Sequence, residues 1–88
     1  MSVSFDFERG EAVIGKKRVA LTPMEASVFG VLIKSRRPMN TPELASKVYG
    51  GQEPDSSYKC IHIYIRRLRE KTGLKIPHRR EYGYEVRP

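Results

Sequence analysis

The chain has 88 residues and a single cysteine, Cys60, and its 17 lysines and arginines against 10 aspartates and glutamates give a formal net charge of +7. A chain of this length folds as one domain with a modest core. One cysteine excludes an intrachain disulfide and favours a reducing compartment. The sequence has no signal peptide and no run of about 18 apolar residues, so we expect a soluble, cytoplasmic protein rather than a membrane protein.

The positive charge is concentrated in the last third of the chain. Residues 1–55 have eight basic and seven acidic residues, whereas residues 56–88 have nine basic and three acidic residues. Such an asymmetry is typical of a nucleic-acid footprint. An anionic membrane could attract the same charge, but the apolar face beside it is expected to be needed for the core.

Residues 3–21 predict a small antiparallel sheet. Apolar and polar residues alternate from residue 3 to residue 7, as expected for a first strand. Two further short apolar segments, 12–14 and 18–21, follow after glycine-containing turns. We interpret this sheet as a scaffold.

Two helices are predicted next. The first, about residues 23–35, begins at a capping box, in which Thr22 and Glu25 can each bond the backbone N–H of the other. The second, about residues 42–49, starts at a Thr-Pro-Glu sequence and ends at Gly50.

A third predicted helix, about residues 56–72, has two opposite faces at 100° per residue. The face expected to be buried comprises Ile61, Ile65, Leu68 and Thr72. The opposite face comprises Ser56, Lys59, Ile63, Arg66, Arg67 and Glu70. Arginines that reach phosphates or guanine edges, with an isoleucine that meets thymine methyl groups, fit a helix that reads the DNA major groove. A basic solvated helix is the alternative.

Residues 75–87 predict a β-hairpin with a turn near Gly83 and with Arg79 and Arg80 at or near its tip. The whole chain, residues 1–88, then reads as a single α+β domain, a winged helix-turn-helix with a short N-terminal antiparallel sheet, three helices and a C-terminal hairpin wing. In such a domain the third helix enters the major groove, and the wing reaches the flanking backbone or the minor groove.

Several sequence elements carry a family resemblance. They are Leu21-Thr22-x-x-Glu25, Leu44 with Val48-Tyr49-Gly50, Ile61-x-Ile63-x-Ile65-Arg66-Arg67-Leu68-Arg69-x-Lys71 and Gly83-Tyr84. In order and spacing they resemble the DNA-binding effector domain of OmpR/PhoB-type response regulators, over roughly residues 3–87. The passage Tyr49-Gly50-Gly51-x-x-Pro54 is most similar to the alphaproteobacterial cell-cycle regulators of that family.

The resemblance implies a bacterial or phage-like, nucleoid-associated regulator that binds double-stranded DNA sequence-specifically. It assigns a group of four residues to the surface that meets bases and phosphates: Lys59, Ile63, Arg66 and Arg67. It assigns Tyr64 to a phosphate contact and Arg80 to the wing. Loop 50–56 corresponds to a connection that can touch RNA polymerase, so the alternative function is an adaptor that holds RNA polymerase or another regulator through this loop or the basic face.

The sequence departs from the family in two respects. Glu81 stands where the family usually has a glycine, which puts the usual insertion of the wing into the minor groove in doubt. No receiver domain precedes the module in these 88 residues, so we expect control by expression level, by a partner or by competition for sites. Because no heptad pattern is present, we expect a monomer in solution that assembles head-to-tail on tandem DNA sites.

No cofactor, metal site or catalytic group is predicted. Cys60 and His62 are two positions apart, so on a helix they point about 160° away from each other and cannot share an ion. No histidine has a plausible nucleophile and carboxylate beside it, so an enzyme is not expected. Stacking of Tyr82 and Tyr84 on unpaired bases is a minor alternative.

Overall fold

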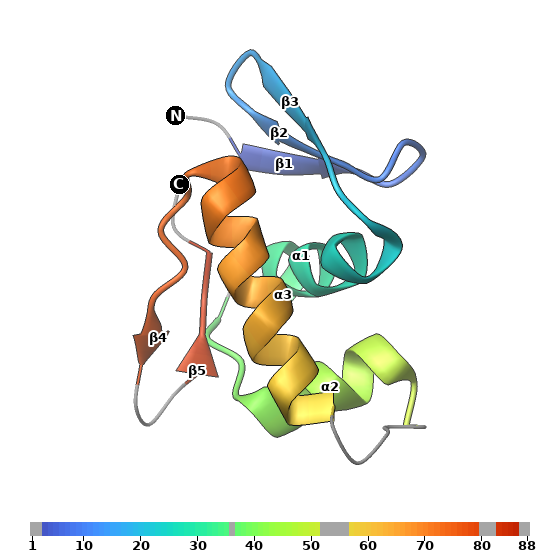
Figure 1. Ribbon diagram of the computed structural model, residues 1–88, viewed down its shortest axis with the longest axis vertical. Helices are drawn as coiled ribbons and strands as arrows, with labels where there is room; N and C mark the ends of the chain where they lie inside the picture. Colours follow the sequence, from blue (N-terminus) through green and yellow to red (C-terminus); the bar gives the residue numbers. More distant parts are fainter. Residues whose placement is uncertain (1–2, 36, 52–56, 80–82, 87–88) are drawn as a thin grey trace.

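The computed structural model describes residues 3–35, 37–51, 57–79 and 83–86, and for Ser57 and Arg79 it describes the backbone only (Figure 1). A three-stranded sheet lies at one end of the molecule, three helices form its body, and a two-stranded hairpin lies beside the last helix. This is the α+β winged-helix arrangement that the sequence predicts. None of the helices in these ranges is long and apolar enough to cross a membrane.

The predicted N-terminal sheet is confirmed. Its strands are β1 (Val3–Asp6), β2 (Glu11–Ile14) and β3 (Lys17–Ala20), which pair antiparallel in the order β1-β2-β3. The first strand is shorter than the alternation predicts, because the Asp6 carboxylate accepts hydrogen bonds from the N–H groups of Glu8 and Arg9, both at 3.1 Å. These bonds turn the chain, and Phe7 therefore leaves the sheet.

The helices are α1 (Pro23–Ser35), α2 (Thr41–Tyr49) and α3 (Ser57–Thr72). The predicted capping box of α1 is confirmed: the Thr22 N–H donates to Glu25 Oε1 at 3.0 Å, and the Glu25 N–H donates to Thr22 Oγ1 at 3.3 Å. Helix α2 begins one residue earlier than predicted. Its cap is Asn40, whose side chain accepts from the Glu43 N–H at 2.8 Å.

The core lies where α3 crosses α1 and α2. The predicted buried face of α3 is confirmed, since Ile61, Ile65 and Leu68 are at most 1% exposed and Thr72 is 6% exposed. The largest apolar side chains packed with them are Phe29, Met39, Leu44 and Ile76. Burial of these apolar groups is the main favourable contribution to folding, and it fixes which face of α3 remains outside.

The hairpin consists of β4 (His78–Arg79) and β5 (Gly83–Tyr84), so its paired part is shorter than the predicted 75–87. Before β4, the Ile76 side chain is buried in the core and its carbonyl accepts from Arg69, so this segment packs against α3 instead of extending the hairpin. Strand β5 also pairs with the α1–α2 connection: the Met39 N–H donates to the Tyr84 carbonyl at 2.8 Å, and the Tyr84 N–H donates to the Met39 carbonyl at 2.7 Å.

Candidate nucleic-acid interface

The solvent-facing side of α3 is a cationic surface with an apolar centre. It carries the predicted residues Lys59, Ile63, Arg66, Arg67 and Glu70, all of which are exposed. Ile63 is 47% exposed, which is unusual for a large apolar side chain on a helix whose other isoleucines are buried. The structure therefore gathers five of the predicted residues on one face, which we call the α3 outer face.

Not every cation of α3 is equally available. Arg69 Nε donates to the Ile76 carbonyl at 3.0 Å, and the Lys71 Nζ lies 2.6 Å from Glu25 Oε1. Arg66 Nε is 3.6 Å from Glu70 Oε1, but both side chains are mostly exposed, so this pair is weak and easily exchanged for another anion. Within the described part of the chain, the side chains of Lys59 and Arg67 form no ion pair or hydrogen bond.

Tyr64 lies at the edge of the α3 outer face, where α3 meets α2. It is half-buried beside Tyr49. Burial, followed by the neighbouring Tyr64 and Cys60, raises the pKa of the Tyr49 hydroxyl to about 12. Tyr49 and Tyr64 are both half-buried and pack against the core.

A histidine and tyrosine cluster attaches the hairpin to α3. His62 Nδ1 is hydrogen-bonded to the Tyr84 hydroxyl, and His78 stacks on the Tyr84 ring at 4.4 Å between ring centroids and 22° between planes. The Arg69 guanidinium lies 5.8 Å from the centroid of the same ring. Burial raises the pKa of Tyr84, although Arg69 opposes this, so the phenol stays protonated at neutral pH. The sequence indicated no partner for either histidine.

A buried ion pair holds α3 against the start of α1. The Glu25 side chain is fully buried, and Lys71 reaches it from the last turn of α3. Burial raises the pKa of Glu25, but the ammonium of Lys71 and the N–H of Thr22 more than offset this and hold the pKa below its ordinary value. The sequence identified Glu25 only as a capping residue. The available signal for this contact was Lys71, which lies next to Thr72 on the predicted buried face of α3.

Some predicted site residues cannot be placed. Ser56, Arg80 and Glu81 lie outside the described residues, as does the side chain of Arg79. Most of loop 50–56 also lies outside them. In the described ranges, no three histidine, cysteine, aspartate or glutamate side chains are grouped so that they could hold a metal ion.

Several solved structures have the same fold, and among them are DNA-binding domains of regulators. A redox sensor of the streptococci that evolved from two-component response regulators has a TM-score of 0.80 and 26% identity, over 97% of this chain. This chain spans only 39% of that protein. The C-terminal DNA-binding domain of RstA from Klebsiella pneumoniae has a TM-score of 0.78 and 21% identity, over 99% of this chain and 84% of that one.

A third structure was determined with bound nucleic acid. It is the DNA-binding domain of the response regulator AdeR in complex with an intercistronic region, with a TM-score of 0.75 and 19% identity, over 96% of this chain and 92% of that one. No family model matches the chain, and no curated protein matches its sequence. The chain therefore has the winged-helix fold of the C-terminal DNA-binding domains of OmpR/PhoB-type response regulators.

Proposed function

We propose that this protein is a transcriptional regulator that binds double-stranded DNA sequence-specifically, with α3 in the major groove. The observation that carries the proposal is the α3 outer face, on which an exposed isoleucine lies among cationic side chains. The fold shared with response-regulator DNA-binding domains supports it. An α-helix fits the major groove, where base pairs present distinct donors, acceptors and methyl groups.

The residues of the outer face divide into two roles. Ile63 and Arg67 read base edges. Ile63 lies at the centre of the face, and Arg67, one turn further along α3, has no ion pair with any described residue, whereas Arg66 pairs with Glu70. Lys59, Arg66 and Tyr64 contact phosphates, as does Ser56, which precedes α3 in the sequence. Phosphate contacts set orientation and affinity, whereas base contacts set the preferred sequence.

Arg79 and Arg80 supply further phosphate contacts from the wing. Their replacement by alanine is therefore expected to weaken binding to all sequences alike. The protein is a monomer in solution and binds tandem half-sites head-to-tail. Sedimentation of the protein, free and with one or two half-sites, tests this assembly: a stable dimer without DNA contradicts it.

A salt series tests the central proposal. Binding of the protein to genomic duplex fragments is measured by gel shift at rising salt, for the wild type and for Lys59→Ala. Each lost phosphate contact is expected to reduce the slope of log K against log salt by about 0.9. Lys17→Ala, which removes the same charge from an exposed position on β3, is the matched control and is expected to leave the slope nearly unchanged. Absent or salt-insensitive duplex binding by the wild type refutes the proposal.

A further inference from the structure

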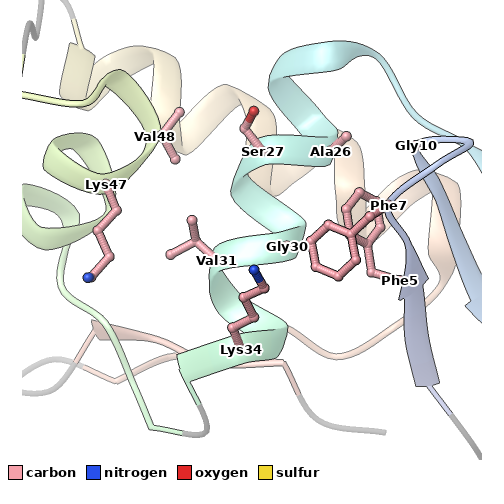
Figure 2. A pocket seen from close by; sticks show the side chains of 10 residues that line it. All are labelled: Phe5, Phe7, Gly10, Ala26, Ser27, Gly30, Val31, Lys34, Lys47 and Val48. Carbon is pink, nitrogen blue, oxygen red and sulfur yellow. The ribbon is translucent and has the colours of Figure 1, made fainter.

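A groove crosses the other side of the molecule, between the end of β1, the outer side of α1 and the last turn of α2 (Figure 2). Its volume is about 350 Å³, at the lower end of the range of about 300–1,000 Å³ for ligand pockets. The lining side chains that matter here are Phe5, Phe7, Val31, Lys34 and Lys47. None of the described residues of α3 or of the hairpin lines it.

The apolar end of the groove is formed by a fixed pair of phenyl rings. Phe7 is 60% exposed, the highest value among the large apolar side chains described. Its ring meets the edge of Phe5 at 4.7 Å between centroids, and Phe5 in turn meets the core residue Phe29 at 5.8 Å. Phe5 can lie across α1 because Gly30 has no side chain; a Cβ there would be 3.3 Å from the Phe5 ring. The exposed phenyl is thus held in place by the core.

Two lysines also line the groove. The Lys34 Nζ lies 4.5 Å from the centroid of the Phe7 ring, and Lys47 stands across the groove on α2. A second compartment of about 320 Å³ shares Val31 and both lysines and adds Arg37, which pairs with Glu43 at 2.8 Å. Among the residues that the structure describes, no acidic side chain lines either compartment and none forms an ion pair with Lys34 or Lys47.

The groove faces away from α3. The core-facing residues of α1 include Glu25, Val28 and Leu32, which are buried. The groove-facing residues Ser27 and Lys34 lie two positions after Glu25 and Leu32, about 200° around the helix axis. A molecule on the α3 outer face therefore leaves the groove open, and the two surfaces can be occupied together.

We propose that this groove binds an acidic amphipathic helix of a partner protein. Apolar side chains one turn apart on such a helix would cover Phe7 and Val31, and carboxylates beside them would meet Lys34 and Lys47. Lysines at helix C-termini also balance the helix dipole, but this role does not account for their position on the two sides of one groove that also exposes a phenyl ring. A DNA backbone would meet the lysines and leave the phenyl uncovered, so an acidic peptide is the better complement.

The test uses the intact protein and a defined probe, a synthetic helical peptide with leucine and tryptophan one turn apart and glutamates at the flanking positions. In ¹H–¹⁵N spectra, the amide resonances of Gly30, Val31 and Lys34 are expected to shift when the peptide is added. The affinity of the protein for a DNA duplex is expected to be the same with and without bound peptide. The double variant Lys34→Glu, Lys47→Glu is expected to weaken peptide binding by at least about tenfold. The double variant Lys16→Glu, Lys17→Glu, with the same change of charge on exposed residues near the β2–β3 turn, is the matched control.

Two control probes complete the design, one with alanine in place of leucine and tryptophan and one with lysine in place of glutamate. Both are expected to lose binding, because one lacks the apolar group and the other the charge. Several results would overturn the proposal: shifts confined to α3, equal loss in the two double variants, stronger binding of anionic phosphatidylserine vesicles than of the peptide, or self-association through the groove. The peptide measurements do not depend on whether the protein binds DNA, so the two proposals fail separately.

Discussion

Replacing Gly83 with alanine should be among the most damaging single substitutions in this fold. Gly83 has φ 103°, a backbone conformation that side chains disfavour, and an added Cβ would lie 2.1 Å from the Met39 carbonyl oxygen. That oxygen cannot retreat without breaking the two main-chain hydrogen bonds, at 2.7 and 2.8 Å, that join Met39 to Tyr84.

The expected loss follows from these contacts. A non-glycine residue in this conformation costs about 1–3 kcal/mol, and two lost backbone hydrogen bonds cost about 0.5–1.5 kcal/mol each. The Gly83→Ala variant should therefore lose about 2–6 kcal/mol of unfolding free energy. A chain of 88 residues has about 4–13 kcal/mol in total, at about 0.05–0.15 kcal/mol per residue.

Urea unfolding followed by far-ultraviolet circular dichroism measures the loss. Gly10→Ala is the matched control, because Gly10 also has a positive φ, 64°, but nothing lies within 4 Å of its added Cβ. It should lose only the backbone contribution, about 1–2 kcal/mol. If Gly83→Ala is no less stable than Gly10→Ala, the close approach of β5 to Met39 does not constrain this position and the reasoning is wrong.

Three further predictions concern side chains. Lys71→Met should lower the free energy of unfolding by about 1–3 kcal/mol at neutral pH. This is less than the loss expected for a fully buried ion pair, because the Lys71 side chain is 38% exposed. Since the folded pKa of Glu25 is lowered, the stability from this pair is present above the ordinary value of 4.5 and is lost as the pH falls through the folded pKa. Urea midpoints of both proteins should therefore converge in acid; a constant gap contradicts this. Ile63→Ala or Arg67→Ala should change the DNA sequence selected from a random duplex pool, with a loss of about 1–3 kcal/mol of binding free energy at each affected base pair. If the selected motif is unchanged, these two residues do not read the bases. Tyr84→Phe removes the hydroxyl partner of the α3 histidine and should lower stability by about 0.5–1.5 kcal/mol; an unchanged thermal midpoint would be inconsistent with that hydrogen bond.

Local signals in the sequence predicted most of the elements. The Thr22 and Glu25 capping box, the glycine after α2 and the two faces of α3 each depend on residues within a few positions of one another, and all were confirmed. The start of α2 was predicted one residue late, because the Thr-Pro-Glu sequence places the cap at Thr41. The structure selects Asn40, whose side chain bonds the N–H three residues on.

Contacts between distant residues could not be predicted in the same way. Glu25 and Lys71 are 46 positions apart, and His62 and Tyr84 are 22 apart, so no periodic pattern relates them. Phe7 shows a different difficulty. Alternation placed it in a strand, but the side chain of Asp6 turns the chain before it, and the ring becomes part of a groove that only the packed molecule forms.

The bridge between Met39 and Tyr84 also bears on folding. It joins the connection between α1 and α2 to β5 across more than forty residues of intervening chain, so its closure carries an entropy cost that local contacts do not. Non-local contacts of this kind slow folding. The connection between α1 and α2 is therefore held by a strand that follows α3 in the chain, and the placement of α2 depends on the wing as well as on the helices.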